Sequence, residues 1–342
     1  MSKHLKNKAE IKVFDRPDEL PEEWDMLYRE DDILNKTSIL QHLFLYSPLE
    51  QKYFWLRRPG GKPLAGPVCR PELPFTAGPI TVHQPATVCS LSMPFSTDPA
   101  FSDIGRVEDV AEVMDSFGGG FQLISGFSEP EPEIDGWSWR RHYPTVDFDV
   151  RWGSFAEYLG AIRSDYKSRV TDALRIGCKL RSLTIPPDSL DEKTYSLYVD
   201  VARRYHSIVL PREFFTKFPT KSYILGLELD AAVLAWAFLV PQGRYLYFLF
   251  GGFNDRLNEE LSIYNNLLLA IIRFAIENKF DKVNLGQTAE LSKMRIGGYP
   301  RERFLLVRHT NCLINQIIKK TDIFSYRKKY PTPHVFKNDE KK

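Results

Sequence analysis

One segment of the chain gathers positive charge at helical spacing. Between residues 163 and 181, the basic side chains outnumber the acidic ones, Asp165 and Asp172. Arginine and lysine at this spacing can bind several phosphates of an anionic donor at once. The same pattern also occurs on a solvated helix face with i, i+4 pairing, and the sequence leaves both interpretations open. The basic residues are Arg163, Lys167, Arg169, Arg175, Lys179 and Arg181.

Two further side chains could perform acid–base chemistry. Tyr264 lies in the first part of a predicted helix, where its hydroxyl could protonate a leaving thiolate or hydroxyl, although half-buried packing is the alternative. Glu228 lies in a predicted strand whose neighbouring side chains point the other way, so its carboxylate is a candidate general base. His206 and His309 have no acidic or cysteine partner at a telling spacing. The sequence shows no Ser-His-Asp triad and no metal-ligand pattern, and we expect no metal.

The elements that must position these residues lie between Ser222 and Gly298. Apolar and aromatic runs separated by Pro and Gly predict three antiparallel strands, and apolar residues at helical spacing predict a long helix behind them. A fourth strand and a short helical segment follow. The predicted ranges are strands 222–229, 233–240 and 245–250, helix 259–278, strand 282–286 and segment 287–295.

Upstream, the periodicity predicts an α/β unit and then a helical segment. Three glycines at 118–120 end a predicted helix instead of opening one, so we do not interpret them as a phosphate loop. A cap signal at Ser164 divides the next long helical pattern. The predicted strands are 11–14, 52–56, 79–82, 87–91, 121–124, 143–150 and 178–184, and the predicted helices are 19–29, 37–46, 101–117, 154–177, 193–204 and 213–218.

Length and composition limit the class of protein. A chain of 342 residues with 43% hydrophobic residues predicts about two globular domains. We expect an N-terminal domain at 1–150, a catalytic domain at 151–330 and a basic tail at 331–342. The formal net charge of +2 gives no global attraction to nucleic acid or to a membrane. Scattered cysteines and the lack of a long apolar run indicate a cytoplasmic chain without a transmembrane segment.

The ordered set of elements resembles the Fem-type acyltransferases of the GNAT superfamily, in which two GNAT-like halves lie in one chain. The resemblance is carried by Phe155-x-x-Tyr-Leu with the segment 163–177, Gly251-Gly252 after an aromatic strand, Tyr264 in the following helix, and Leu285-Gly-Gln with Lys293-x-x-x-Gly297. It covers most of residues 145–300, and the first 125 residues only by the order of elements. It implies an α/β fold of two lobes, each a central mixed sheet flanked by helices.

The resemblance also implies a reaction. Family members transfer an acyl or aminoacyl group to an amine, from acyl-coenzyme A in plain GNAT enzymes and from aminoacyl-tRNA in Fem enzymes. The acceptor would be a small-molecule amine or an amino acid, and a tRNA could bind the basic helix at 163–181. In the GNAT fold, two neighbouring parallel strands diverge and leave main-chain groups free to hold the donor carbonyl. Here those strands would be residues 245–250 and 282–286.

Site residues follow from these positions. Gly251, Gly252 and Gly286 would let a donor approach the backbone, and Gln287 would orient an amide or simply begin a helix. Lys293 and Arg295 would bind a phosphate or carboxylate, or form a surface pair. Lys167 and Arg169 would contact the donor, with Tyr264 and Glu228 as the candidate catalytic pair.

One departure from the family opens an alternative. Coenzyme A-dependent members bind the pyrophosphate with a glycine-rich loop at a helix N-terminus. This chain instead places Asn258 as a predicted cap and Glu259 and Glu260 in the predicted first turn, where carboxylates repel phosphate. The alternative function is therefore a GNAT-like module that binds a ligand or partner without turnover.

Overall fold

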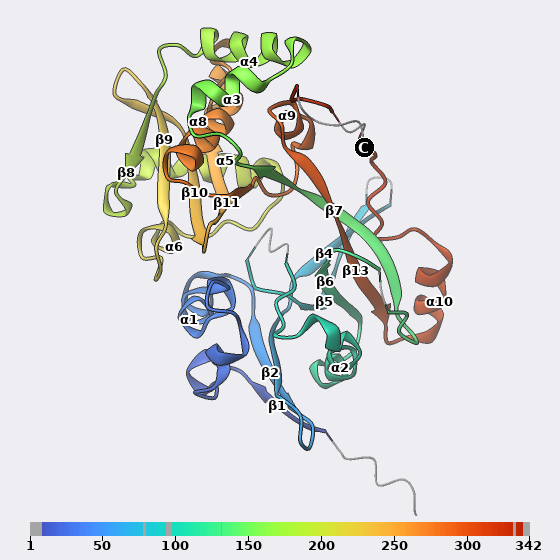
Figure 1. The fold of residues 1–342 in the computed structure, drawn as a ribbon. Helices are drawn as coiled ribbons and strands as arrows, with labels where there is room; N and C mark the ends of the chain where they lie inside the picture. The colour runs from blue at the N-terminus through green and yellow to red at the C-terminus, as the bar shows by residue number, and fades with distance from the viewer. Residues whose placement is uncertain (1–8, 78–79, 94–97, 131, 331–332, 338–342) are drawn as a thin grey trace, which may run out of the picture. The chain divides into compact units, whose positions relative to one another are not determined.

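The computed structural model describes residues 9–77, 80–93, 98–130, 132–330 and 333–337, and they form two compact units (Figure 1). The first unit takes the chain up to Tyr143 and again from Glu302 to Arg327, and the second takes Pro144–Arg301 and the chain from Lys328. The chain passes between the units inside two long strands, β7 (Ser138–Asp149) and β13 (Tyr299–His309). This division differs from the expected one at residues 150 and 151, because most of β13 pairs with β6 of the first unit.

The first unit is a mixed sheet with helices. Its strands lie in the order β1-β2-β3-β5-β6-β13, and β4 pairs with β5. β5 and β6 are parallel, and the other neighbours are antiparallel. The elements are β1 (Glu10–Phe14), α1 (Thr37–Tyr46), β2 (Gln51–Arg57), β3 (Leu64–Cys69), β4 (Glu72–Ala77), β5 (Ile80–Cys89), α2 (Val107–Val113), β6 (Phe121–Phe127) and α10 (Cys312–Lys320).

Several predictions for this unit were wrong. The predicted helix at 19–29 is replaced by two 3₁₀ turns, Pro17–Glu19 and Trp24–Leu27, because Pro21 cannot supply an amide inside a helix. The strands expected at 79–82 and 87–91 form one strand, β5, although Pro79 lies outside the described residues. Strands β3 and β4 were missed because prolines interrupt their apolar pattern.

The second unit contains the segment expected to be catalytic. Its strands lie in the order β7-β12-β11-β10-β9-β8, and only the described pair β11 and β12 is parallel. The elements are α3 (Phe155–Ala161), α4 (Ser164–Ile176), β8 (Arg181–Ile185), α5 (Glu192–Arg204), α6 (Arg212–Thr216), β9 (Tyr223–Leu229), β10 (Ala232–Gln242), β11 (Tyr245–Phe253), α7 (Asn258–Leu261), α8 (Ile263–Glu277), β12 (Lys282–Asn284) and α9 (Glu290–Arg295).

Strand β10 shows how helices cover both faces of this sheet. Ala235, Ala237 and Leu239 belong to the core cluster that contains the buried face of α8. The alternate residues Trp236 and Phe238 pack against aromatic rings of α5 and α6. The Trp236 Nε1 also donates a hydrogen bond of 2.8 Å to a carbonyl of α5. A strand buried on both faces reads as a continuous apolar run, as this one does.

The described part of the predicted basic tail is packed, not solvated. Val335 and Phe336 are 1% and 7% exposed and belong to the core of the second unit. The Val335 carbonyl accepts a hydrogen bond of 2.9 Å from the Arg163 amide, and Ile162 and Phe336 form a β-bridge. Residues 333–337 therefore close the α3–α4 connection.

The mixed α/β class with sheets flanked by helices is confirmed by this architecture. Within the described residues, no helix has both the length and the apolar character needed to cross a membrane.

Two glycines of the second unit give a matched test of packing. A Cβ on Gly252 would lie 2.2 Å from main-chain atoms of Leu197 and Tyr198 in α5, whereas a Cβ on Gly160 of α3 would meet nothing within 4 Å. We expect Gly252→Ala to lower the free energy of unfolding by about 1 to 3 kcal/mol through overpacking. We expect Gly160→Ala to raise it by about 0.5 to 1 kcal/mol. Urea unfolding of both variants checks this, and equal stability of Gly252→Ala and wild type would contradict it.

Candidate functional site

The parallel strands β11 and β12 are paired over only part of β11. Tyr245, Leu246 and Tyr247 align with Lys282, Val283 and Asn284, and no pairing follows. β11 continues to Phe253, and within the described residues β10 is its only strand partner over this part. Main-chain groups along one edge of β11 are therefore left without a strand partner beyond Tyr247, as the divergence expected from the sequence requires.

The chain after β12 follows β7 instead of β11. The Leu285 amide donates to the Val146 carbonyl at 2.8 Å, and the Val146 amide donates to the Gly286 carbonyl at 3.0 Å. The Gly286 amide donates to the Asn284 side-chain oxygen at 2.7 Å. Because these groups are satisfied on the β7 side, they cannot pair with β11, and the opening persists.

A β-bulge in β11 adjoins the opening. Phe250 aligns with Phe238 of β10 and Phe248 aligns with Leu239, so Leu249 is an extra residue. The bulge reverses the alternation of side chains, because Phe248 packs on the α8 face while Phe250 packs among the rings of α5 and α6. Bulges often redirect groups near functional sites, and this one lies where β12 departs.

Lys293 lies at the mouth of this opening. It is 2% exposed, and its Nζ donates a hydrogen bond of 2.7 Å to the Gln287 carbonyl. A Cβ built on Gly286 would lie 4.0 Å from this Nζ and 3.3 Å from the Phe248 carbonyl of β11. Gly286 has a φ of +75°, a backbone conformation that favours glycine because it has no side chain. The three residues therefore meet at the divergence.

Burial changes the protonation of Lys293. Desolvation lowers the pKa of its ammonium to about 7, opposed by the negative charge of Glu290 one turn earlier in α9. Near neutral pH, a large share of this amine is thus uncharged and has a free lone pair. A buried amine with such a pKa can exchange protons with a reacting group.

Tyr264 and Glu290 belong to the same neighbourhood. Burial raises the pKa of the Tyr264 hydroxyl well above its usual value, with further contributions from Tyr205 and Glu290, so it stays protonated near neutral pH and can donate a proton. Its ring also packs at 5.3 Å against Phe253 at the end of β11. Glu290 is 6% exposed and accepts a hydrogen bond of 3.2 Å from the Tyr330 hydroxyl.

Sequence reasoning missed Glu290. The signal that could have found it is its i, i+3 spacing to Lys293 on one short helix. Its partner Tyr330 is forty residues away in sequence, so no local pattern could have indicated that contact.

Other predicted site residues lie elsewhere. Gly251 and Gly252 are in β11, where a Cβ would strike the Trp236 carbonyl and the backbone of α5, which gives both glycines a packing role. Glu228 of β9 forms a hydrogen-bonded ion pair with Arg181 of β8 and lies beyond β10 from the opening. Arg295 is exposed in the last turn of α9.

The basic segment forms helix α4 with the preceding cap region. Arg163, Lys167 and Arg169 are exposed, and the structure records no ion pair for them among its described residues. Arg175 pairs with Asp172 at 3.2 Å, so the i, i+3 pairing of a solvated face accounts for that residue. The Asn266 side chain connects α8 to α4, because it donates a hydrogen bond of 2.8 Å to the Ala173 carbonyl.

The predicted acidic start of the long helix was wrong. Ser262, in the left-handed region at φ 49°, separates a short helix, α7, from α8, and Glu259 and Glu260 lie in α7. The first turn of α8 contains no acid. The N-cap of α8 is Ser262 and not the predicted Asn258, but the Asn258 side-chain oxygen accepts a hydrogen bond of 2.9 Å from the Tyr264 amide in the first turn of α8.

This arrangement can hold a carbonyl and exchange a proton. The free edge of β11 offers main-chain donors, Lys293 offers an amine, and Tyr264 offers a hydroxyl. Among the described residues, no group of three or more His, Cys, Asp or Glu side chains could hold a metal ion.

Comparisons with known proteins find similarity to one domain family and to solved structures. Residues 217–294 match the family model of the acetyltransferase (GNAT) domain. The structure is similar to that of FemX, with 12% identity and a TM-score of 0.54 over 87% of this chain and 98% of that one. A search of curated proteins found no match.

Two solved structures are similar at lower scores. The C-terminal domain of a putative lysylphosphatidylglycerol synthetase from Agrobacterium fabrum has 10% identity and a TM-score of 0.48, covering 75% of this chain and 83% of its own. L-PGS from Bacillus licheniformis has 10% identity and a TM-score of 0.45, covering 83% and 93%. Residues 217–294 therefore match a GNAT domain, and the fold of the chain is similar to that of FemX.

The lowered pKa of Lys293 predicts a specific pH dependence of stability. The unfolded chain keeps this proton up to about 10.5, its usual pKa, whereas the folded chain releases it near 7. The contribution of this group to the free energy of unfolding should therefore rise from pH 7 to about 10.5, with a slope of up to about 1.4 kcal/mol per pH unit. We expect Lys293→Met to lose this rise in urea unfolding measured across that range.

The exposed Lys167→Met is the matched control and should keep the wild-type profile. A Lys293→Met profile parallel to that of wild type would show that the buried amine does not titrate in this window.

Proposed function

We propose that this protein is an acyltransferase that moves an acyl or aminoacyl group to the amine of a small molecule or an amino acid, with the reacting carbonyl in the opening between β11 and β12. The observation that supports this most is the end of β11–β12 pairing at Tyr247 beside the buried Lys293. Unpaired amides along β11 would stabilise the oxyanion that forms when the amine attacks.

Lys293 is the proposed general base. The acceptor nitrogen bonds to the carbonyl carbon and gives a proton to the neutral Nζ, and the bond to the donor oxygen or sulfur then breaks. The Tyr264 hydroxyl, which stays protonated, can supply a proton to that leaving group. A base with a pKa near the working pH is effective because it is often in the correct protonation state.

We propose aminoacyl-tRNA as the donor, with acyl-coenzyme A as the alternative. Asn258 already occupies an amide at the start of α8 that a pyrophosphate would use, and Glu259 and Glu260 lie just before it. The exposed Lys167 and Arg169 of α4 offer charge for an RNA backbone. A tRNA donor would place the reaction in the cytoplasm.

The role of Lys293 can be tested by substitution. We expect Lys293→Met to lower kcat/KM for transfer by roughly 10²- to 10⁴-fold, the usual contribution of a general base. Activity of the wild type should rise with pH through about 7, where the printed pKa of this amine lies. Rates of transfer to a free amine at several pH values measure both.

Lys293→Arg distinguishes a base from a fixed positive charge. Arginine stays protonated at these pH values, so it should not restore activity. Full activity of Lys293→Arg would contradict the proposed base and indicate oxyanion stabilisation by charge.

The donor can be tested on helix α4. We expect the double variant Lys167→Glu and Arg169→Glu to weaken the binding of aminoacyl-tRNA by roughly tenfold or more and to reduce its salt dependence, because phosphate contacts are lost. The matched control is the double variant Lys319→Glu and Lys320→Glu, which reverses the charge of two exposed residues of α10. It should bind as wild type does. Thermal shifts with aminoacyl-tRNA and with acetyl-coenzyme A provide the measurement. Stabilisation by acetyl-coenzyme A alone would favour the alternative donor.

A further inference from the structure

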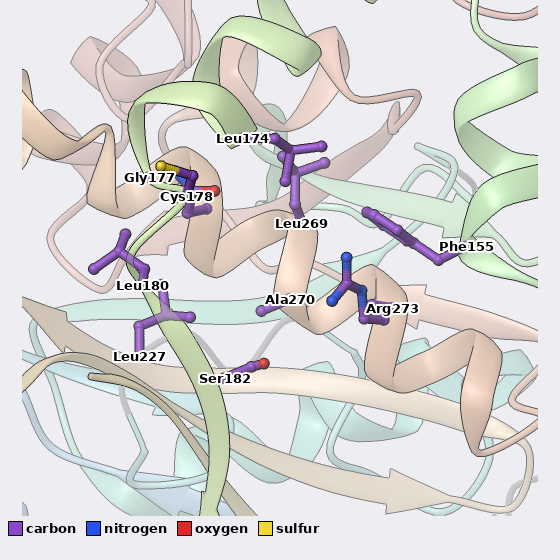
Figure 2. Close-up of a pocket in the computed structure, with 11 residues that line it drawn as sticks. Phe155, Leu174, Gly177, Cys178, Leu180, Ser182, Leu227, Leu269, Ala270 and Arg273 are labelled. Atoms are coloured by element: carbon purple, nitrogen blue, oxygen red, sulfur yellow. The ribbon is translucent and has the colours of Figure 1, made fainter. Parts of the chain in front are cut away.

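The second unit contains a cavity that the proposed reaction does not use. It has a volume of about 230 Å³ and lies among α4, the turn that follows it, β8, β9 and α8 (Figure 2). Strand β10 separates β9 from β11 in the sheet, so the cavity is distinct from the opening beside Lys293. Neither Lys293 and Tyr264 nor Lys167 and Arg169, which the proposed reaction uses, line it.

Most of the side chains that line this cavity are apolar. Leucines from α4, the turn, β9 and α8 line it together with Ala270 and the ring of Phe155 (Figure 2). No Asp or Glu is among the lining residues. The lining leucines are Leu174, Leu180, Leu227 and Leu269.

One cation faces this apolar space. The Arg273 guanidinium lies 4.3 Å from the centre of the Phe155 ring, and the structure records no carboxylate within ion-pair distance of it among the described residues. Neighbouring arginines differ, because Arg175 is paired with Asp172 and Arg181 with Glu228. Arg273 thus keeps its donors available for a planar, bidentate acceptor, which is the geometry of a carboxylate.

The Asn266 side chain fixes the other end of the cavity. Asn266 is 7% exposed, and its Nδ2 donates hydrogen bonds to the carbonyls of Ala173, Leu261 and Ser262. These bonds hold α4 and α8 together and leave no donor of this amide for a ligand. A single cation beside mostly apolar side chains favours a monoanion with an apolar body over a phosphate, which requires several donors.

We propose that this cavity binds a small carboxylate with an apolar body, of the class of medium-chain fatty acids. The carboxylate pairs with Arg273, and the chain lies against the leucine walls. The site does not depend on the proposed transfer reaction, since it shares no residue with it.

Cys178 provides a direct measurement of occupancy. It is exposed and lines the cavity, whereas Cys69 and Cys89 are buried, so a Cys312→Ser background leaves Cys178 as the exposed thiol among the described cysteines. Cys178 is allowed to react with a disulfide reagent that releases a coloured product. The rate of this reaction is measured at increasing concentrations of sodium octanoate. We expect octanoate to slow the reaction in a saturable way and octan-1-ol, which lacks the charge, to protect far less.

Variants separate the two halves of the site. We expect Arg273→Gln to weaken octanoate binding by roughly tenfold, as loss of a charge-assisted hydrogen bond predicts. Ser182→Phe, in the exposed strand β8, should fill the cavity and abolish protection. Arg175→Gln is the matched control and should bind as wild type does. Circular dichroism verifies that each variant is folded.

Three results would overturn this proposal: no protection by octanoate, equal protection by octan-1-ol, or unchanged affinity in both Arg273→Gln and Ser182→Phe. Because no acyl donor is present, these outcomes are independent of the outcome of the Lys293 experiments.

Discussion

The second unit depends on a competition for hydrogen bonds at the end of β12. Leu285 and Gly286 bond to Val146 of β7, and the Asn284 side chain occupies the Gly286 amide. Buried backbone groups are nearly always hydrogen-bonded. Because Leu285 and Gly286 bond to β7, these groups are not available to pair with β11. The bulge at Leu249 adds to the separation. The opening is thus a consequence of satisfied hydrogen bonds on the β7 side.

Dense packing around this opening sets the chemistry of Lys293. Helix α8 covers one face of the sheet and α5 and α6 cover the other, and Gly252 lets α5 approach the backbone of β11. Taking an ammonium out of water is costly, which lowers its pKa. The negative charge of Glu290 opposes part of this lowering. The same packing keeps the Tyr264 hydroxyl protonated.

Sequence reasoning found the elements of this unit better than their boundaries. Strands β9, β10 and β11 were expected because β-branched and aromatic runs predict strands wherever they are buried. The break at Ser262 was not expected, because a left-handed serine inside an apolar helical pattern has no local signal. The alternation of side chains along its strand made Glu228 a candidate base, but its carboxylate forms an ion pair with the cross-strand neighbour Arg181.

The sequence by itself determined the class of this protein: the order of strands and helices, the glycine at 286 and the lysine at 293, because these follow from local periodicity and residue type. Only the tertiary structure decided what each charge faces. It left Arg273 without an ion pair among the residues that the structure describes, packed Val335 and Phe336 into the core, and buried Lys293. The reason is physical: hydrogen-bond partners, burial and desolvation depend on residues far apart in the chain, which periodicity does not encode.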